Sequence, residues 1–235
     1  MRLPTFFYLL LAAAFLAGCA GNDIHVNDGA FLPSARMSVG LSKHEGAPTT
    51  PQSGHAIEGS YHGARGHTEQ EREVGDDQII YQGVTFPVVV ELNHDYSFRS
   101  GEIMYRWRKF FGQRQSFGVE ALGGVGHNIF YLTTTAAGGL AASHKFNSTG
   151  LALAVGGIWR FQPQTSLQVR ITAIGGNAKE EVSASRFDLH VVHAVSRNVA
   201  VRGGLTSWSV DVERTGNSDI RASFGGPAVA LEIAF

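Results

Sequence analysis

The chain has 235 residues, a length that suits a single domain. Only 17 % of the residues are charged and the formal net charge is −1, so the composition gives no support for a nucleic-acid partner. Cys19 is the single cysteine, which excludes an internal disulfide.

The N-terminus has the features of an export signal. Arg2 precedes an apolar run at 6–16 that is too short to span a bilayer. The sequence Leu-Ala-Gly-Cys at 16–19 then resembles a bacterial lipobox. This resemblance implies that residues 1–18 are a signal peptide and that Cys19 carries acyl chains such as palmitate. Several chains are needed for stable anchoring.

Residues 19–78 are predicted to form a lipidated N-terminal arm. Apolar residues alternate within 36–43, and 55–62 alternates weakly, so this region offers an extra hairpin. That hairpin would raise the expected strand number from eight to ten. Residues 64–78 are rich in acidic side chains and are predicted to form a solvated loop.

Residues 79–235 alternate between apolar and polar or small side chains, the period expected of half-buried strands. We therefore predict an all-β fold, an antiparallel up-and-down transmembrane β-barrel of eight strands. An additional strand at 136–145 is an alternative. The predicted strands are 79–92, 97–110, 115–129, 149–161, 165–174, 183–195, 199–212 and 221–235.

The connections between these strands alternate in length. Outer-membrane barrels have short periplasmic turns and longer outer loops. A periplasmic C-terminus puts every short connection on the periplasmic side. The short connections are 111–114, 162–164 and 196–198, and the long ones are 130–148, 175–182 and 213–220.

The C-terminal strand carries the most specific signal. Val229, Leu231, Ile233 and Phe235 alternate with small or polar residues, and a terminal Phe after such a run resembles the C-terminal signal of outer-membrane barrels. The barrel region 79–235 as a whole resembles small barrels of the OmpA/OmpX kind. The resemblance implies a bacterial outer-membrane location, contact with membrane lipid, and recognition of the last strand by the barrel assembly machinery.

The polar faces of the strands carry acids and arginines but no lysine. Arginine suits close pairing because its guanidinium binds a carboxylate at two points. A narrow barrel is filled by its own side chains, so we expect these charges to pair inside it. The predicted lumen network is Glu102, Arg106, Arg108, Glu120, Arg160, Arg170, Asp188, Arg202 and Glu232, and Glu91 and Arg186 share the same face.

Aromatic residues gather near the predicted strand ends, as in the girdles of membrane barrels. One group lies near the periplasmic ends and the other near the outer ends. The first group is Trp107, Phe110, Phe111, Phe117, Trp159, Phe161 and Phe235, and the second is Phe98, Phe130, Tyr131, Phe187 and Phe224.

No catalytic, cofactor or metal site is predicted. The spacing of the histidines matches no short zinc pattern. Asp188 and His190 share a strand face, but the nearby His193 faces the other way. The expected function is therefore structural or surface-interacting, with the oligomeric state left open. The alternatives are a soluble, lipid-anchored barrel that binds an apolar ligand as lipocalins do, an outer-membrane acyl-modifying enzyme, and a small channel.

Overall fold

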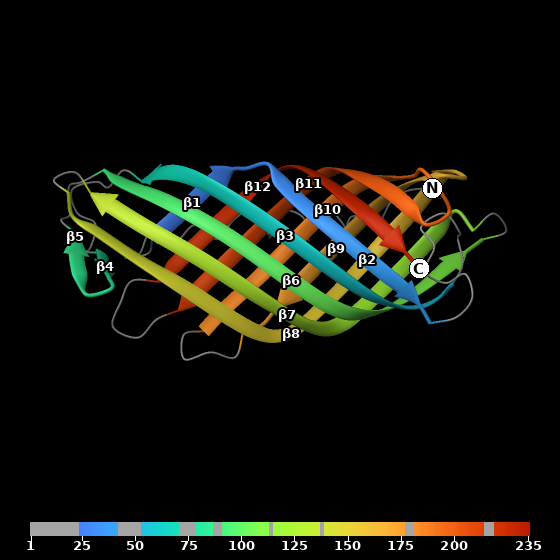
Figure 1. The fold of residues 1–235 in the computed structure, drawn as a ribbon, viewed down its shortest axis with the longest axis horizontal. Helices are drawn as coiled ribbons and strands as arrows, with labels where there is room; N and C mark the ends of the chain where they lie inside the picture. The colour runs from blue at the N-terminus through green and yellow to red at the C-terminus, as the bar shows by residue number, and fades with distance from the viewer. Residues whose placement is uncertain are drawn as a thin grey trace, which may run out of the picture.

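The computed structural model describes eight segments of the chain: 24–41, 53–70, 79–86, 91–112, 115–136, 139–176, 181–213 and 219–235. The predicted signal peptide and Cys19 lie outside these residues. Every regular element in the described segments is a β-strand. No helix in this part of the chain is long and apolar enough to cross a membrane. The long strands wrap into an elongated barrel in which they run obliquely (Figure 1).

Twelve strands lie in the described segments. They are β1 (Ile24–Gly29), β2 (Leu32–Gly40), β3 (Gly54–Gln70), β4 (Ile79–Tyr81), β5 (Val84–Phe86), β6 (Leu92–Phe111), β7 (Phe117–Ala136), β8 (Ala141–Gln162), β9 (Thr165–Ile174), β10 (Glu181–Ala194), β11 (Val199–Glu213) and β12 (Ile220–Ala234).

The barrel is a closed ring of nine strands with β1 added. Around the ring the order is β12, β11, β10, β9, β8, β7, β6, β3 and β2, and β2 pairs again with β12. All neighbours are antiparallel except β2 and β12, which are parallel. A ring with an odd number of up-and-down strands requires one parallel pair, because its first and last strands run in the same direction. β1 pairs with β12 in the same register as β2, so the two strands follow one edge of β12.

The β-barrel is confirmed, but the predicted eight antiparallel strands are wrong. Seven of the predicted strands are in the ring. The predicted strand at 79–92 is instead the separate two-stranded sheet β4–β5, followed by the start of β6. β2 and β3, from the region where an extra hairpin was the alternative, complete the ring. Residues 136–145 add no strand of their own, because they include the end of β7 and the start of β8.

The β4–β5 hairpin closes one end of the barrel. Gln82 and Gly83 form its two-residue loop with φ of 52° and 75°, and a type I′ turn requires positive φ at both positions. Ile79, Tyr81 and Phe86 are fully buried and pack on the barrel's apolar core. The Tyr81 hydroxyl donates to the backbone oxygen of Leu132 at 2.9 Å. We call this the hairpin end (Figure 1, left).

The opposite end, where β12 finishes, is called the C-terminal end. The connections at 163–164 and 195–198 are short, as predicted. At the hairpin end, the connection between β7 and β8 is shorter than the predicted long loop, because both strands extend further than expected.

Candidate functional site

The barrel reverses its polarity along its length, and β6 shows the change most clearly. Starting from the hairpin end, its inward side chains are first mainly apolar and then mainly charged, while its outward side chains are first polar and then apolar. The inward order is Leu92, His94, Tyr96, Phe98, Ser100, Glu102, Met104, Arg106, Arg108 and Phe110. The outward order is Asn93, Asp95, Ser97, Arg99, Gly101, Ile103, Tyr105, Trp107, Lys109 and Phe111.

The same reversal occurs on the other side of the ring. On β10, the buried residues change from Val182 and Ala184 to Arg186 and Asp188. The outward residues change from serines at 183 and 185 to Phe187 and later apolar residues. The reversal is therefore a property of the whole barrel and divides it into two halves.

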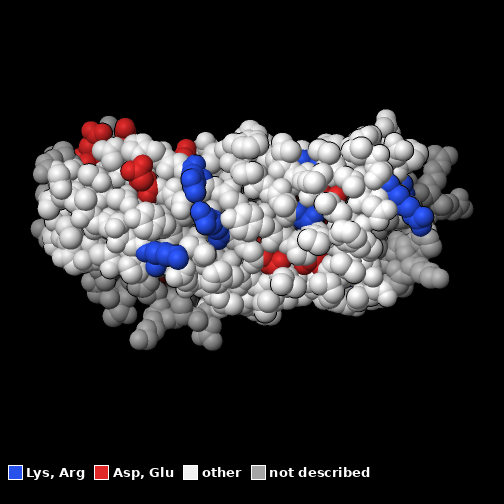
Figure 2. Space-filling model, viewed as in Figure 1, with Lys and Arg blue, Asp and Glu red and all other residues white. Residues whose placement is uncertain are grey.

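The outer surface of the C-terminal half is an apolar belt to which all nine strands of the ring contribute. In Figure 2 this surface is mainly uncharged, with smaller charged areas, and larger charged side chains lie toward the hairpin end. The exposed apolar residues of the belt include Met37, Val39, Ile57, Tyr61, Ile103, Tyr105, Trp107, Val119, Val125, Leu151, Leu153, Val155, Ile171, Phe187, Val191, Val201, Leu205, Val229 and Leu231.

Inside the hairpin half lies an aromatic core. Phe98 packs against Trp208 and Phe224, with ring centroids 4.7 Å and 5.2 Å apart. Tyr96 stacks on Phe224 at 5.4 Å. Rings at these separations stabilise one another beyond the area they bury. The side chains of this core are Tyr81, Phe86, Tyr96, Phe98, Phe130, Phe146, Trp208 and Phe224.

Inside the C-terminal half lies an ionic network of eleven buried side chains. Five are acids and six are arginines, so the network has one excess positive charge. Its members are Arg36, Glu58, Glu102, Arg106, Arg108, Glu120, Arg170, Arg186, Asp188, Arg202 and Glu232. Charges removed from water are costly unless they are paired and hydrogen-bonded, so the arrangement of partners decides whether the interior is stable.

Glu58 on β3 binds three arginines of this network. Arg106 lies 2.7 Å from one carboxylate oxygen, and Arg36 lies 3.3 Å from the other. Arg170 reaches Glu58 from β9 on another part of the ring. A carboxylate has two oxygens and about four acceptor sites, so it can serve several donors at once. Glu58 thereby ties β2, β6 and β9 together through the lumen.

Arg170 connects Glu58 to a second carboxylate. Its Nε donates to Glu120 Oε1 at 2.8 Å, and its Nη2 lies 2.6 Å from the same oxygen. Arg108 binds the other Glu120 oxygen at 2.9 Å. Arg170 therefore lies between two acids, and its side chain is only 1 % exposed.

Arg186 organises the part of the network nearest the aromatic core. It binds Glu102 through two guanidinium nitrogens and Asp188 Oδ2 through Nε at 2.9 Å. Its guanidinium carbon also lies 4.9 Å from the Trp208 ring centroid. This cation–π contact joins the ionic network to the aromatic core.

Arg202 and Glu232 form the remaining pair, on neighbouring strands β11 and β12. Arg202 also donates to the Gln168 side-chain oxygen at 3.0 Å. Glu232 lies 3.9 Å from Arg106, which links this pair to the Glu58 cluster.

Of the nine residues predicted for the lumen network, the structure brings eight together. Arg160 lies apart, half-buried, and donates to the backbone oxygen of Pro163 at 2.6 Å. Glu91 is exposed. Sequence reasoning missed Arg36 and Glu58 because both lie in the region assigned to the N-terminal arm. Each lies on the polar face of an alternating run, and this pattern could have identified both as lumen residues.

On β6, β7 and β8, a row of polar side chains lies between the ionic network and the aromatic core. Ser100, Asn128 and Ser148 lie side by side on β6, β7 and β8. Their side-chain oxygens, and the Asn128 amide nitrogen, are buried without a hydrogen-bond partner among the described residues. Such groups in proteins are normally satisfied by ordered water, so this is where we expect water inside the barrel.

The predicted aromatic girdle at the C-terminal end faces outward for the most part. Trp107, Phe111, Phe117, Trp159, Phe161 and Phe235 are exposed there, whereas Phe110 points inward. The predicted girdle at the other end is wrong for Phe98, Phe130 and Phe224, which lie inside the barrel in the aromatic core. In the C-terminal strand, Val229, Leu231 and Phe235 are exposed, and Ile233 is partly exposed.

In the described part of the chain, no group of three or more His, Cys, Asp or Glu side chains is arranged to hold a metal ion. Comparisons with protein-family models, curated proteins and solved structures find no match. The chemistry of the barrel is therefore the basis of the functional argument.

Proposed function

We propose that this chain is a structural or surface-interacting barrel of the bacterial outer membrane. In this proposal, the C-terminal half crosses the bilayer and the hairpin end lies in solvent. The reversal of polarity along the barrel is the observation that carries the proposal. A continuous apolar belt of this extent is unfavourable in water and matches the lipid-facing band of membrane barrels.

The aromatic side chains support the same placement. Trp159 and Phe117 stack on the outer surface at the C-terminal end, with centroids 6.4 Å apart. Aromatic rings favour the boundary between hydrocarbon and water, where head groups lie. The other boundary of the belt lies near Gly101 and Arg99 on β6, where the outward side chains become polar.

The interior supports a role without conduction or catalysis. Six arginines and five acids are paired with one another across the lumen. The aromatic core and the β4–β5 hairpin fill the other half. This packing disfavours the lipocalin-like alternative, in which the apolar interior would hold a ligand.

Three measurements test this function. After cell fractionation, the protein should stay with the outer membrane in alkaline carbonate and leave it in detergent, and its gel mobility should change on heating. Reconstituted in planar bilayers, it should give no sustained current. Release by carbonate would support the soluble alternative, and stable single-channel steps would support a small channel.

The predictions for the two ends of the chain remain part of this proposal. Acylation of Cys19 would add a lipid anchor to the barrel. The alternating, outward Val229 and Leu231, with Phe235 at the end, would be available to the barrel assembly machinery.

A further inference from the structure

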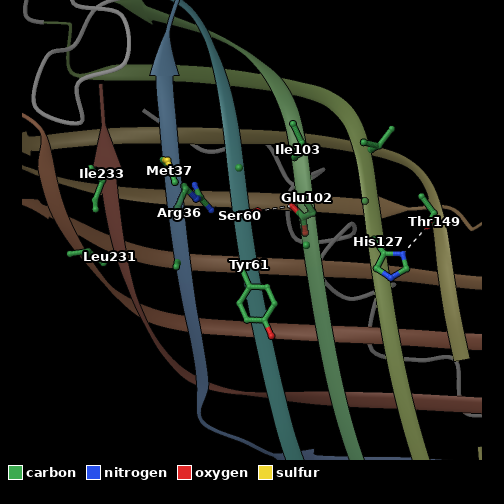
Figure 3. Close-up of a pocket in the computed structure, with 15 residues that line it drawn as sticks. Arg36, Met37, Ser60, Tyr61, Glu102, Ile103, His127, Thr149, Leu231 and Ile233 are labelled. Atoms are coloured by element: carbon green, nitrogen blue, oxygen red, sulfur yellow. Dashed lines mark hydrogen bonds between the residues drawn. The ribbon is translucent and has the colours of Figure 1, made fainter. Parts of the chain in front are cut away.

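The outer wall of the barrel contains a groove that runs across several strands. Its cavity volume is about 540 Å³, within the range of sites that hold small molecules. The lining residues come from six strands, β12, β2, β3, β6, β7 and β8. Figure 3 shows Leu231 and Ile233 at one end and His127 with Thr149 at the other.

The groove exists because two outward positions are glycine. Gly59 lies between the outward residues Ile57 and Tyr61 on β3. Gly101 lies between the outward residues Arg99 and Ile103 on the neighbouring strand β6. Without side chains at these two positions, the surface drops to the level of the backbone. Met37, Ile103 and Val125 form apolar walls around this floor.

One end of the groove is polar. His127 Nδ1 and Thr149 Oγ1 are hydrogen-bonded at 2.7 Å on the exposed face. Arg99, also exposed, is the next outward residue after Gly101 toward the hairpin end. The groove thus begins in the apolar belt and ends where the surface becomes polar and carries a positive charge.

We propose that this groove binds an acyl chain of an anionic membrane lipid, with the head group at His127, Thr149 and Arg99. The inference rests on the proposed membrane location and adds a specific lipid site to it. The long apolar part fits a hydrocarbon chain, and the polar end lies where the head group of a lipid in the leaflet on the hairpin side would lie. Arg99 selects a phosphate-bearing, negatively charged head group.

The test fills the groove without disturbing the fold. A Cβ at Gly101 meets no atom within 4 Å, so Gly101→Leu is sterically allowed and occupies the floor. Gly157 is an equally open, outward glycine on β8 that does not line the groove. Gly157→Leu is therefore the matched control, and heat-modifiable gel mobility checks that both variants fold.

The full chain is reconstituted in phosphatidylcholine vesicles that contain phosphatidylglycerol with a photoreactive diazirine on its acyl chain. After irradiation, mass spectrometry should find adducts concentrated on peptides that contain Met37, Ile103 or Leu231. Gly101→Leu should lower these adducts about tenfold, which corresponds to the lost contact of roughly two methylene groups. Gly157→Leu should leave them unchanged. In the unmodified protein, unlabelled phosphatidylglycerol should reduce the adducts more than the same amount of phosphatidylcholine does. In Arg99→Gln the two unlabelled lipids should reduce them equally.

Three results would overturn the site. Equal adducts in the Gly101→Leu and Gly157→Leu proteins, or adducts spread evenly over the belt, would mean ordinary bilayer contact. Dimers that a protein–protein cross-linker captures in the unmodified protein but not in Gly101→Leu would identify the occupant as a second copy of the chain. An absence of adducts anywhere on the belt would contradict the membrane location itself, which distinguishes failure of the proposed function from failure of the groove.

Discussion

Replacing Arg170 with methionine tests whether the ionic network holds the barrel together. Methionine keeps much of the volume and removes the charge. The change deletes the contacts of Arg170 with Glu58 and Glu120, all of them buried. Breaking a buried ion pair by removing one partner typically costs about 3–5 kcal/mol of folding free energy.

The net charge of the network decides which variant loses more folding free energy within this range of about 3–5 kcal/mol. With six arginines and five acids the network carries +1, so Arg170→Met makes it neutral, while Glu120→Gln raises it to +2. After Arg170→Met, Glu58 keeps Arg36 and Arg106, and we expect a loss of about 3 kcal/mol. Glu120→Gln leaves two arginines facing a neutral amide, so we expect about 5 kcal/mol.

The assay is equilibrium unfolding in urea of the protein refolded in lipid vesicles, followed by tryptophan fluorescence. Arg160→Met is the matched control, because Arg160 is half-buried and donates to a backbone oxygen outside the network. It should cost about 1 kcal/mol. If Arg170→Met lowers the unfolding free energy no more than Arg160→Met does, the network does not stabilise the barrel. If Glu120→Gln lowers it less than Arg170→Met does, the net charge of the network does not set the order of the two variants.

Two further predictions concern the outer surface and the hairpin. Ile171→Arg places a charge in the apolar belt and should lower the unfolding free energy in lipid by about 2–4 kcal/mol. Ser183→Arg, on the polar exterior, should change it by less than about 0.5 kcal/mol. Similar costs for the two variants would contradict the position of the belt. Tyr81→Phe removes the hydrogen bond to the Leu132 backbone oxygen and should lower the unfolding free energy by about 1 kcal/mol. Amide hydrogen exchange should become faster only in the hairpin and the residues it contacts. Unchanged exchange there would show that this bond does not hold the hairpin.

The strands could be predicted from the sequence wherever one face was consistently apolar. Within 165–174, Leu167, Val169 and Ile171 alternate with Gln168, Arg170 and Thr172, and the predicted bounds equal those of β9. The strand at 79–92 was wrong because Gln82 and Gly83 form a tight turn within the apolar run. Local alternation does not reveal such a turn.

The polarity reversal explains most of the remaining errors. Phe98, Phe130 and Phe224 have the strand parity of the charged lumen residues, so they point inward. Their aromatic character suggested an outward girdle instead. The position of a residue along a strand, odd or even, decides whether its side chain points inward or outward, and its aromatic or charged character does not. Here the inward side chains change from charged to aromatic within single strands. The ring of nine also depended on long-range pairing of β2 with β12, for which the sequence has no local signal.

The parallel pairing of β1 with β12 has a consequence for the predicted lipid anchor. β1 begins beside Ile220, at the hairpin end, because the Ile24 amide donates to the Asp219 oxygen at 2.8 Å. Cys19 precedes Ile24 by five residues, which reach at most about 18 Å. The 15 residues of β12 extend over roughly 50 Å. An acylated Cys19 would therefore enter the leaflet on the hairpin side, away from Phe235.

Epitope tags at the two ends test this arrangement. A tag inserted after Ala20 should bind antibody on intact cells, and a tag after Phe235 should bind only after permeabilisation. Cys19→Ser should abolish labelling by a palmitate analogue and leave the barrel in the membrane, because the apolar belt alone holds it there. Two tags on the same side would require an even number of strands and would refute the parallel closure. Unchanged palmitate labelling in Cys19→Ser would instead refute only the anchor.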